Sequence, residues 1–266
     1  MSGIIKLVKK KRMNMYYDSV KQWNLFVGCK FNCLYCKKSF QAQMKRQKKN
    51  CIKCYNYDPH SHEDRLTQKL PITEGDQFIW VCSSGDISFI DPDFMQKILD
   101  KLETLKDRTF LIQTKDPSWF FKFKFPDNCI LGITLETNRD ENYKDISNAP
   151  LPSKRYEDFK KLDFHRKSIT IEPILDFDDD ILFQWVSNIE PERIYIGYDT
   201  KKNSLNEPFL TKTIDFIELL ENFLPDIKIK LKFMKNLFRD KNLEPFEKKI
   251  EEKSNKKRTG TLDDFI

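Results

Sequence analysis

The chain has 266 residues, of which 39% are hydrophobic and 33% are charged, and its formal net charge is +6. This length suits one large α/β domain with a core that 22 Phe residues can help to fill, and no run approaches the ~20 apolar residues of a membrane-spanning helix. Seven cysteines without a signal peptide favour the reducing cytoplasm, where thiols bind metals more often than they form disulfides.

The first elements in chain order are a basic segment and a cysteine loop. Residues 1–18 include four consecutive cations at 9–12, and we expect this segment to be loosely ordered. An apolar run at 22–28 predicts a strand, which leads into Cys29, Cys33 and Cys36. A Lys-rich helical stretch follows, so the order is strand, cysteine loop and helix.

The three cysteines have the spacing C-x3-C-x2-C. A loop this short can wrap three sulfur atoms around one face of an iron–sulfur cube. One iron would then have no protein ligand, and an open coordination position distinguishes a reactive metal site from a structural one. Zinc ligation is an alternative, although zinc sites favour C-x2-C pairs. Disulfide pairing is disfavoured because three is an odd number.

An insert at residues 51–70 gathers a second set of metal-ligand types: Cys51, Cys54, His60 and His62. The C-x2-C pair is a common metal-ligand spacing, and four nitrogen and sulfur ligands suit tetrahedral zinc. The short separation between cysteines and histidines differs from that of a zinc finger, and we expect a turn at Pro59 to be needed for both imidazoles to reach the thiols. An active-site role of His62 and ordinary surface chemistry are the alternatives.

Short strands and amphipathic helices alternate along the rest of the chain. Helical periodicity predicts helices at 93–105, 179–189 and 212–223. Apolar runs predict buried parallel strands at 77–83, 108–114, 129–136, 167–174 and 192–198, with a further edge strand at 227–233. The alternation predicts an α/β fold, a partial (β/α)6 TIM-like barrel with an open side, over residues 19–234. Residues 235–266 would form a charged C-terminal extension.

Ligands of parallel α/β barrels bind at the carboxyl ends of the strands, so polar residues there are candidate cofactor-binding groups. A capping or turn role is the alternative for each. Cys82, at the end of strand 77–83, is placed either to donate a hydrogen atom to a substrate radical or to pack in the core. The polar candidates are Ser83, Ser84, Asp86, Thr114, Lys115, Glu136 and Glu172.

The cysteine motif, with Tyr35 before its third cysteine, resembles the opening of radical S-adenosylmethionine (radical SAM) enzymes. The strand ends LIQTKDP, LGITLET, ITIEPIL and IYIGY resemble those of small radical SAM proteins of phages and archaea and, more distantly, of spore photoproduct lyase. The resemblance implies a 4Fe–4S cluster held by Cys29, Cys33 and Cys36, with S-adenosylmethionine at the open iron. One electron would split this cofactor, and the resulting 5′-deoxyadenosyl radical would take a hydrogen atom from the substrate.

The resemblance also implies roles for individual residues and a redox partner. Asp86, or Ser83 and Ser84, would accept hydrogen bonds from the amino group of S-adenosylmethionine, and Glu136 would hold ribose hydroxyls. A one-electron donor such as ferredoxin or flavodoxin would reduce the cluster. Two aromatic residues of the cysteine loop would shield the cluster and pack against adenine, with core packing as the alternative: Phe31 and Tyr35.

Charge suggests a class of substrate. Residues 19–57 contain nine Lys or Arg and no Asp or Glu, and a field of one sign attracts anions such as nucleic acid or nucleotides. A solvated Lys-rich face is the alternative. The last residues, 259–266, resemble a tail that binds a sliding clamp, with docking on its own domain as the alternative.

Three functional hypotheses follow from these patterns. The first is a radical SAM enzyme that modifies or repairs nucleic acid or a nucleotide. The second is the same radical chemistry on a protein or a small metabolite. The third is a non-catalytic, zinc-bound module that binds nucleic acid.

Overall fold

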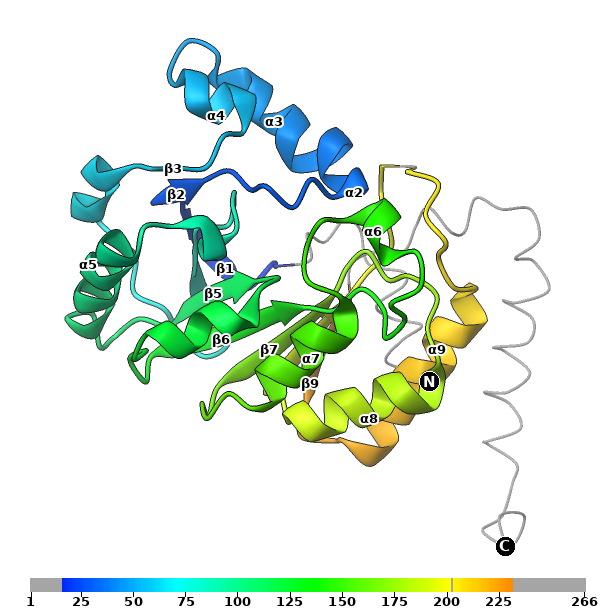
Figure 1. The fold of residues 1–266 in the computed structure, drawn as a ribbon. Coiled ribbons are helices and arrows are strands. Elements are labelled where there is room, and N and C mark those ends of the chain that lie inside the picture. The colour runs from blue at the N-terminus through cyan, green and yellow to red at the C-terminus, as the bar shows by residue number, and fades with distance from the viewer. Residues whose placement is uncertain (1–15, 202, 232–266) are drawn as a thin grey trace, which may run out of the picture.

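Seven parallel strands form one curved sheet in the order β1-β4-β5-β6-β7-β8-β9 (Figure 1). The computed structural model describes residues 16–231 except 202. The strands are β1 Ser19–Trp23, β4 Phe78–Val81, β5 Phe110–Thr114, β6 Cys129–Thr134, β7 Lys167–Ile171, β8 Arg193–Ile196 and β9 Lys228–Leu231. The sheet is a half-barrel with open edges, which confirms the predicted partial TIM-like barrel.

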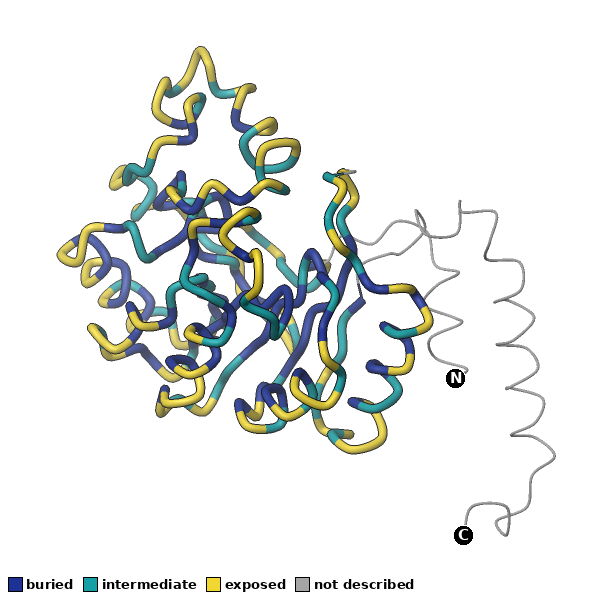
Figure 2. The backbone as a smooth tube through the Cα atoms, turned by 45° about the vertical axis from the view of Figure 1, so that its right-hand side comes forward, coloured by how far each residue is buried: buried dark blue, intermediate teal, exposed yellow. Residues whose placement is uncertain are grey.

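Helices cover the outer face of the sheet: α5 Pro92–Glu103, α7 Pro152–Lys160, α8 Asp179–Ile189 and α9 Leu210–Phe223 (Figure 1). Their apolar sides pack in the main core with outward-facing strand residues such as Ile112 and Ile194. Asp91 begins α5, since its carboxylate accepts a hydrogen bond from the N–H of Phe94 at 3.1 Å. Figure 2 shows the resulting pattern, with buried strands and helices exposed on their outer sides.

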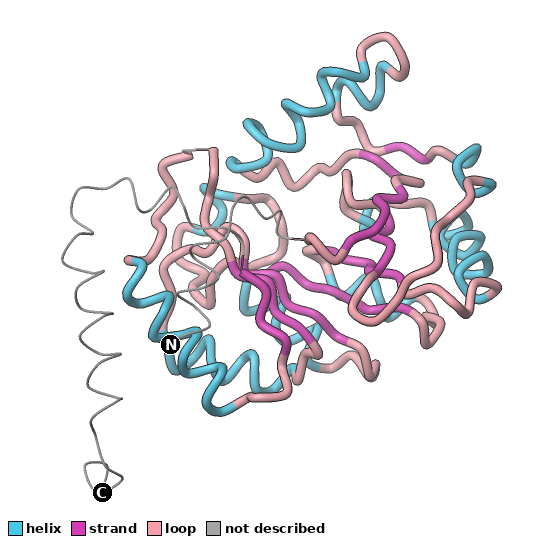
Figure 3. The backbone as a smooth tube through the Cα atoms, turned by 180° about the vertical axis from the view of Figure 1, so that it is seen from behind, coloured by secondary structure: helices cyan, strands magenta, loops and turns pink. Residues whose placement is uncertain are grey.

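The inner face of the sheet carries a separate set of side chains, because successive strand residues point to opposite faces. Phe78 and Trp80 of β4 point inward, and Tyr16 packs against Trp80 and Tyr195 at ring-centroid distances of 4.1 and 4.6 Å. The view from behind shows that no described helix crosses this face (Figure 3). The three rings therefore pack together on the inner face of the sheet.

The chain leaves the sheet between Trp23 and Phe26, so the predicted strand at 22–28 is wrong in its bounds. The strand in the sheet, β1, begins at Ser19, and a second short strand, β2 Phe26–Val27, pairs antiparallel with β3 His60–Ser61. At this point the side chain of Asn24 replaces the strand pairing, since its Oδ1 accepts a hydrogen bond from the N–H of Ser84 at 2.9 Å. This exit carries the cysteine loop over the carboxyl end of the sheet.

The Lys-rich stretch after the cysteine loop is helical but not uniform. It consists of α2 Leu34–Cys36, the π-helical η1 Lys37–Gln41, α3 Ala42–Met44 and the 3-10 helix η2 Lys45–Gln47, followed by α4 Ile52–Asn56. The segment with α3 and α4 rises from the barrel (Figure 1). Shorter elements near the strand ends are η3 Glu63–Thr67, η4 Ile87–Phe89, η5 Pro117–Lys122 and α6 Tyr143–Ile146.

Two predicted segments fall largely or wholly outside the described residues. They are the basic segment 1–18, of which 16–18 are described, and the charged extension 235–266 with its clamp-like end. Across 16–231, with 202 excepted, no helix has the length and apolar character needed to cross a membrane. The predicted edge strand at 227–233 is confirmed by β9, which pairs with β8.

Candidate functional site

A cavity of about 430 Å³ lies at the carboxyl end of the sheet, beneath the cysteine loop. Residues that end or directly follow five of the strands reach it, because parallel strands present their carboxyl ends at one edge. The loop residues that line it are Cys29, Phe31, Cys33, Tyr35 and Cys36. The strand-end residues include Cys82, Ser83, Asp86, Thr114, Lys115, Thr134, Glu172 and Asp199.

Two glycines hold the cysteine loop against the end of β4. Gly28 has φ +101°, and a Cβ there would lie 2.4 Å from the backbone carbon of Asp58. A Cβ on Gly85 would lie 2.7 Å from the carbonyl oxygen of Gly28. The two backbones meet directly, since Gly28 N–H donates to Ser84 O at 3.1 Å and Asp86 N–H donates to Gly28 O at 3.2 Å. Neither position therefore accepts a side chain.

Hydrogen-bond donors surround the three loop sulfur atoms. The N–H of Phe31 donates to Sγ of Cys29 at 3.4 Å, and the Sγ of Cys33 forms a hydrogen bond with Oγ of Ser147 at 3.0 Å. A hydrogen bond between the thiols of Cys33 and Cys36 lowers the pKa of Cys33 and raises the pKa of Cys36. Burial raises the pKa of Cys29 above its usual range.

These residues fit an iron–sulfur cluster. Three sulfur atoms from one loop border one cavity, and N–H and O–H donors to sulfur are the groups that tune the potential of such clusters. Among the described residues, the one group with ligand atoms close enough for a single metal ion lies elsewhere, at Cys51, Cys54, His60 and His62.

Beside the cysteine loop, a buried carboxylate binds several donors. Glu136 is 0% exposed and accepts hydrogen bonds from Nη1 of Arg155 at 2.8 Å and from the hydroxyl of Tyr143 at 3.0 Å. The Nζ of Lys115 and the hydroxyl of Tyr35 also contact it. Burial alone would raise the pKa of Glu136, but Arg155 and then Lys115 outweigh burial and lower this pKa to about 2. Tyr35 thereby ties the cysteine loop to the sheet.

Two predicted cofactor-binding residues do not line the cavity. Glu136 was expected to hold ribose hydroxyls, but its carboxylate is occupied by its internal donors, and burial removes it from the cavity wall. Ser84 was expected near the amino group of S-adenosylmethionine, but its backbone N–H and carbonyl bind Asn24 and Gly28. Both residues therefore support, through their hydrogen bonds, the residues that line the cavity.

Asp86 lines the cavity and also organises the loop around it. Its Oδ1 accepts hydrogen bonds from Oγ1 of Thr114 at 2.6 Å and from the N–H of Ser88 at 3.0 Å. Its Oδ2 accepts one hydrogen bond, from the N–H of Lys115 at 2.8 Å. Burial raises the pKa of Asp86, although these donors oppose the shift. The second lone pair of Oδ2 leaves room for one further donor.

The remaining predicted residues occupy the cavity wall in different ways. Cys82 is buried beneath the loop, and burial raises the pKa of its thiol to about 12. Phe31 packs on Phe89 at a ring-centroid distance of 4.7 Å. The Oγ of Ser83 donates to Oδ1 of Asn24 at 3.0 Å. Glu172 follows β7 and borders the cavity.

Several residues of the site carried no signal in the sequence. Arg155 lies in the middle of α7, 19 positions from Glu136, and sequence spacing does not predict their pairing. Ser147 follows α6 and reaches Cys33 across 114 positions. The hydroxyl of Tyr16 donates to Oε1 of Gln113 at 3.0 Å and so forms part of the cavity floor. All these contacts join segments that are far apart in the chain.

The cysteine–histidine insert brings all four predicted ligands together. The Nε2 of His60 lies 3.3 Å from Sγ of Cys54, and the Nε2 of His62 lies 3.1 Å from the same sulfur. The expectation that a turn at Pro59 is needed is wrong, because residues two apart in an extended chain point to the same face. None of the four ligands lines the cavity.

The basic residues after the cysteine loop lie on an exposed face next to the cavity. Lys45, Lys48 and their neighbours are exposed, and Nζ of Lys45 lies 4.3 Å from the ring centroid of Tyr55. Phe40 and Gln43, from the same helical run, line the cavity itself. The helical run from 34 to 47 therefore borders the cavity on one side and presents cations to solvent on the other.

No family model matches the chain, and no curated protein matches it in sequence. Its structure is similar to that of a spore photoproduct lyase variant with a dinucleoside spore photoproduct, with a TM-score of 0.56 at 10% identity, over 78% of this chain and 75% of the other. A second variant, with bound AdoMet and the same dinucleoside, has a TM-score of 0.53 at 10% identity, over 83% and 85%. Streptococcus suis SuiB bound to S-adenosylmethionine gives 0.49 at 11% identity, over 79% and 49%. The chain therefore shares its fold with spore photoproduct lyase.

Proposed function

We propose that this protein is a radical SAM enzyme. The main support is the position of the three thiols of the C-x3-C-x2-C loop, which border one cavity at the carboxyl end of a parallel half-barrel. The likeness of the fold to that of spore photoproduct lyase supports the same proposal. A zinc-only binding module does not explain why three cysteines border a cavity of this size, because structural zinc sites are closed.

In this proposal Cys29, Cys33 and Cys36 hold a 4Fe–4S cluster. When bound, the cluster would supply one electron for the reductive cleavage of S-adenosylmethionine, the chemistry that would initiate hydrogen-atom abstraction from the substrate. The chain positions and shields these groups. Phe31 packs with the loop cysteines, and Asp86, which lines the cavity, would accept a hydrogen bond from an ammonium group.

Anaerobic reconstitution with iron and sulfide tests the proposal. The wild-type protein, given S-adenosylmethionine and a strong reductant, should release 5′-deoxyadenosine, measured by mass spectrometry. Cys33→Ala should release none. Cys129→Ala is a matched control. Cys129 is a similarly buried cysteine, but it lies at the amino end of β6, far from the cavity, and pairs with Phe110. Equal product from Cys33→Ala and wild type would refute the proposal.

For the substrate, we propose nucleic acid or a nucleotide. The exposed cations of the helical run that borders the cavity support this class, because phosphates bind cationic surfaces. Spore photoproduct lyase is described with a dinucleoside bound, and the same fold makes such a substrate a natural candidate here. An external one-electron donor such as ferredoxin or flavodoxin would complete the reaction.

Affinity for a single-stranded oligonucleotide, measured against salt concentration, tests the substrate class. Binding should weaken with a log–log slope near −0.7 for each phosphate contacted. Replacing four exposed cations by Gln should reduce the slope: Lys45, Arg46, Lys48 and Lys49. A control variant changes four exposed lysines elsewhere: Lys97, Lys106, Lys122 and Lys124. Equal slopes for the two variants would contradict the assignment of this face.

A further inference from the structure

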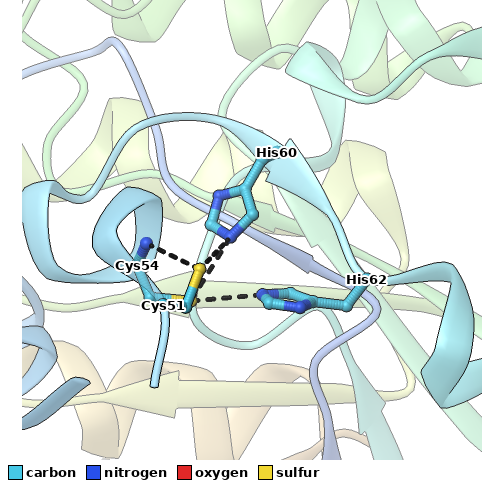
Figure 4. Close-up of side chains that lie close together, drawn as sticks. All are labelled: Cys51, Cys54, His60 and His62. Carbon is cyan, nitrogen blue, oxygen red and sulfur yellow. Dashed lines mark hydrogen bonds between the residues drawn. The ribbon is translucent and has the colours of Figure 1, made fainter. Parts of the chain in front are cut away.

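Outside the cavity, the insert places four metal-ligand side chains around one point (Figure 4). Their ligand atoms all lie within 4.8 Å of one another. Sγ of Cys54 is 3.3 Å from Nε2 of His60 and 3.1 Å from Nε2 of His62, and Sγ of Cys51 is 3.4 Å from Nε2 of His60. The two thiols come from the start of α4, and the imidazoles come from β3 and the residue after it.

The backbone prepares these atoms to act as ligands. Nδ1 of His60 lies 2.7 Å from the carbonyl oxygen of Asp58. A carbonyl can only accept, so Nδ1 carries the proton and Nε2 presents its lone pair to the thiols. The N–H of Cys54 donates to Sγ of Cys51 at 3.4 Å, which orients that sulfur toward the same point. Such contacts to ligand atoms are typical of metal sites.

We propose that Cys51, Cys54, His60 and His62 bind one Zn²⁺ ion in a tetrahedral structural site. Two thiolates balance the charge of a divalent cation, and two neutral imidazoles complete four-coordination, so the bound site has no net charge. Protein side chains would fill all four coordination positions of the ion, and none of these four side chains lines the cavity. A closed site of this kind stabilises structure and leaves no position for a substrate.

The site would fix the segment that supports the cysteine loop. His60 pairs with Val27 in the two-stranded sheet, and the N–H of His62 donates to the carbonyl of Leu25 at 2.7 Å. The backbone of Asp58 lies against Gly28, where a Cβ would be 2.4 Å away. The metal would therefore join α4 to β3, which pairs with β2, the strand that leads into Cys29.

This joint is needed because the insert has little core of its own. Its two buried residues, Cys54 and Tyr57, form a small cluster with Val27 and Met44, which lie outside the insert. Three or four buried side chains bury too little apolar area to order a segment of this length, and small units are often stabilised by a metal instead. Metal binding would then supply the missing stability of the insert.

Metal analysis of the purified full-length protein tests the zinc site. Wild type, expressed with zinc, should contain about one zinc ion per chain by mass spectrometry. The variant with Cys29, Cys33 and Cys36 replaced by Ala should keep the zinc and lose its iron. Cys54→Ser should lose most of the zinc, by at least about fivefold, and Cys129→Ser serves as its matched control.

A measurement on the unaltered protein covers the case in which Cys54→Ser fails to fold. X-ray absorption at the zinc edge of wild type should show two sulfur ligands at about 2.3 Å and two nitrogen ligands at about 2.0 Å. Zinc far below one per chain in wild type, or a zinc shell without sulfur, would overturn the site. Because iron is counted separately in the triple cysteine variant, failure of the zinc site can be distinguished from failure of the cluster.

Discussion

The buried carboxylate of Glu136 is predicted to be a main source of stability, and Glu136→Gln removes its charge. The change leaves the volume of the side chain nearly constant, so packing is preserved. It leaves Arg155 without a counter-ion. This loss is costly because Arg155 is 0% exposed and its Nε and Nη2 have no hydrogen-bond partner. Lys115 loses its buried partner at the same time. One buried and one partly buried cation would then lack the anion that compensates them.

The cost follows from the pKa of Glu136. Its pKa falls from 4.5 to about 2 in the folded protein. At ~1.4 kcal/mol per pKa unit, ionised Glu136 stabilises the fold by roughly 3 kcal/mol. Breaking a buried ion pair by removing one partner typically costs about 3–5 kcal/mol, which agrees with this figure. We therefore expect Glu136→Gln to lower the free energy of unfolding by about 3 kcal/mol at pH 7.

The predicted pH dependence has a definite sign. Because the pKa is lowered on folding, the stabilisation is present above pH 4.5 and is lost as the pH falls from 4.5 toward 2. Near pH 3 the difference between wild type and Glu136→Gln should shrink to roughly 1 kcal/mol. Urea denaturation at several pH values measures it, with Glu157→Gln as an exposed control on α7. A difference below about 1 kcal/mol at pH 7, or one that is independent of pH, would refute the reasoning.

The other predictions concern the cavity wall. Gly28→Ala places a Cβ 2.4 Å from the backbone of Asp58, so thermal denaturation should show a lower melting temperature, and iron content after reconstitution should fall; unchanged values would contradict the close approach. Tyr35→Phe removes one donor to Glu136 and should cost about 2 kcal/mol in urea denaturation while leaving iron content unchanged. Asp86→Asn turns one acceptor into a donor and should lower the melting temperature by several degrees, since about 2 kcal/mol is lost; a melting temperature equal to that of wild type would rule out this role.

The half-barrel could be predicted because each strand and helix has a local signal. The predicted strand at 129–136 begins with a mostly apolar run, as expected of a strand covered on both sides, and β6 is buried along its whole length. Pro92 after the capping residue Asp91 indicated the start of α5. The cysteine spacing likewise predicted that Cys29, Cys33 and Cys36 act together, and all three border one cavity.

The network behind the cavity could not be predicted, because its contacts depend on how distant segments meet. Glu136 was expected to face a ligand, since it ends a strand at the carboxyl edge. The arrival of Arg155 from α7 and Tyr35 from the loop encloses it instead. The point near Asn24 where the chain leaves the sheet could not be predicted either, because the residues before and after it are apolar and together predict one continuous strand.

The central claim is that Cys29, Cys33 and Cys36 hold a cluster with one iron open to S-adenosylmethionine. Electron paramagnetic resonance of the reduced, reconstituted protein tests it most directly. A protein with this cluster should give a 4Fe–4S¹⁺ signal, with about four iron ions per chain, that changes when S-adenosylmethionine is added. A protein that binds no iron, or a cluster signal that is identical with and without S-adenosylmethionine, would contradict it.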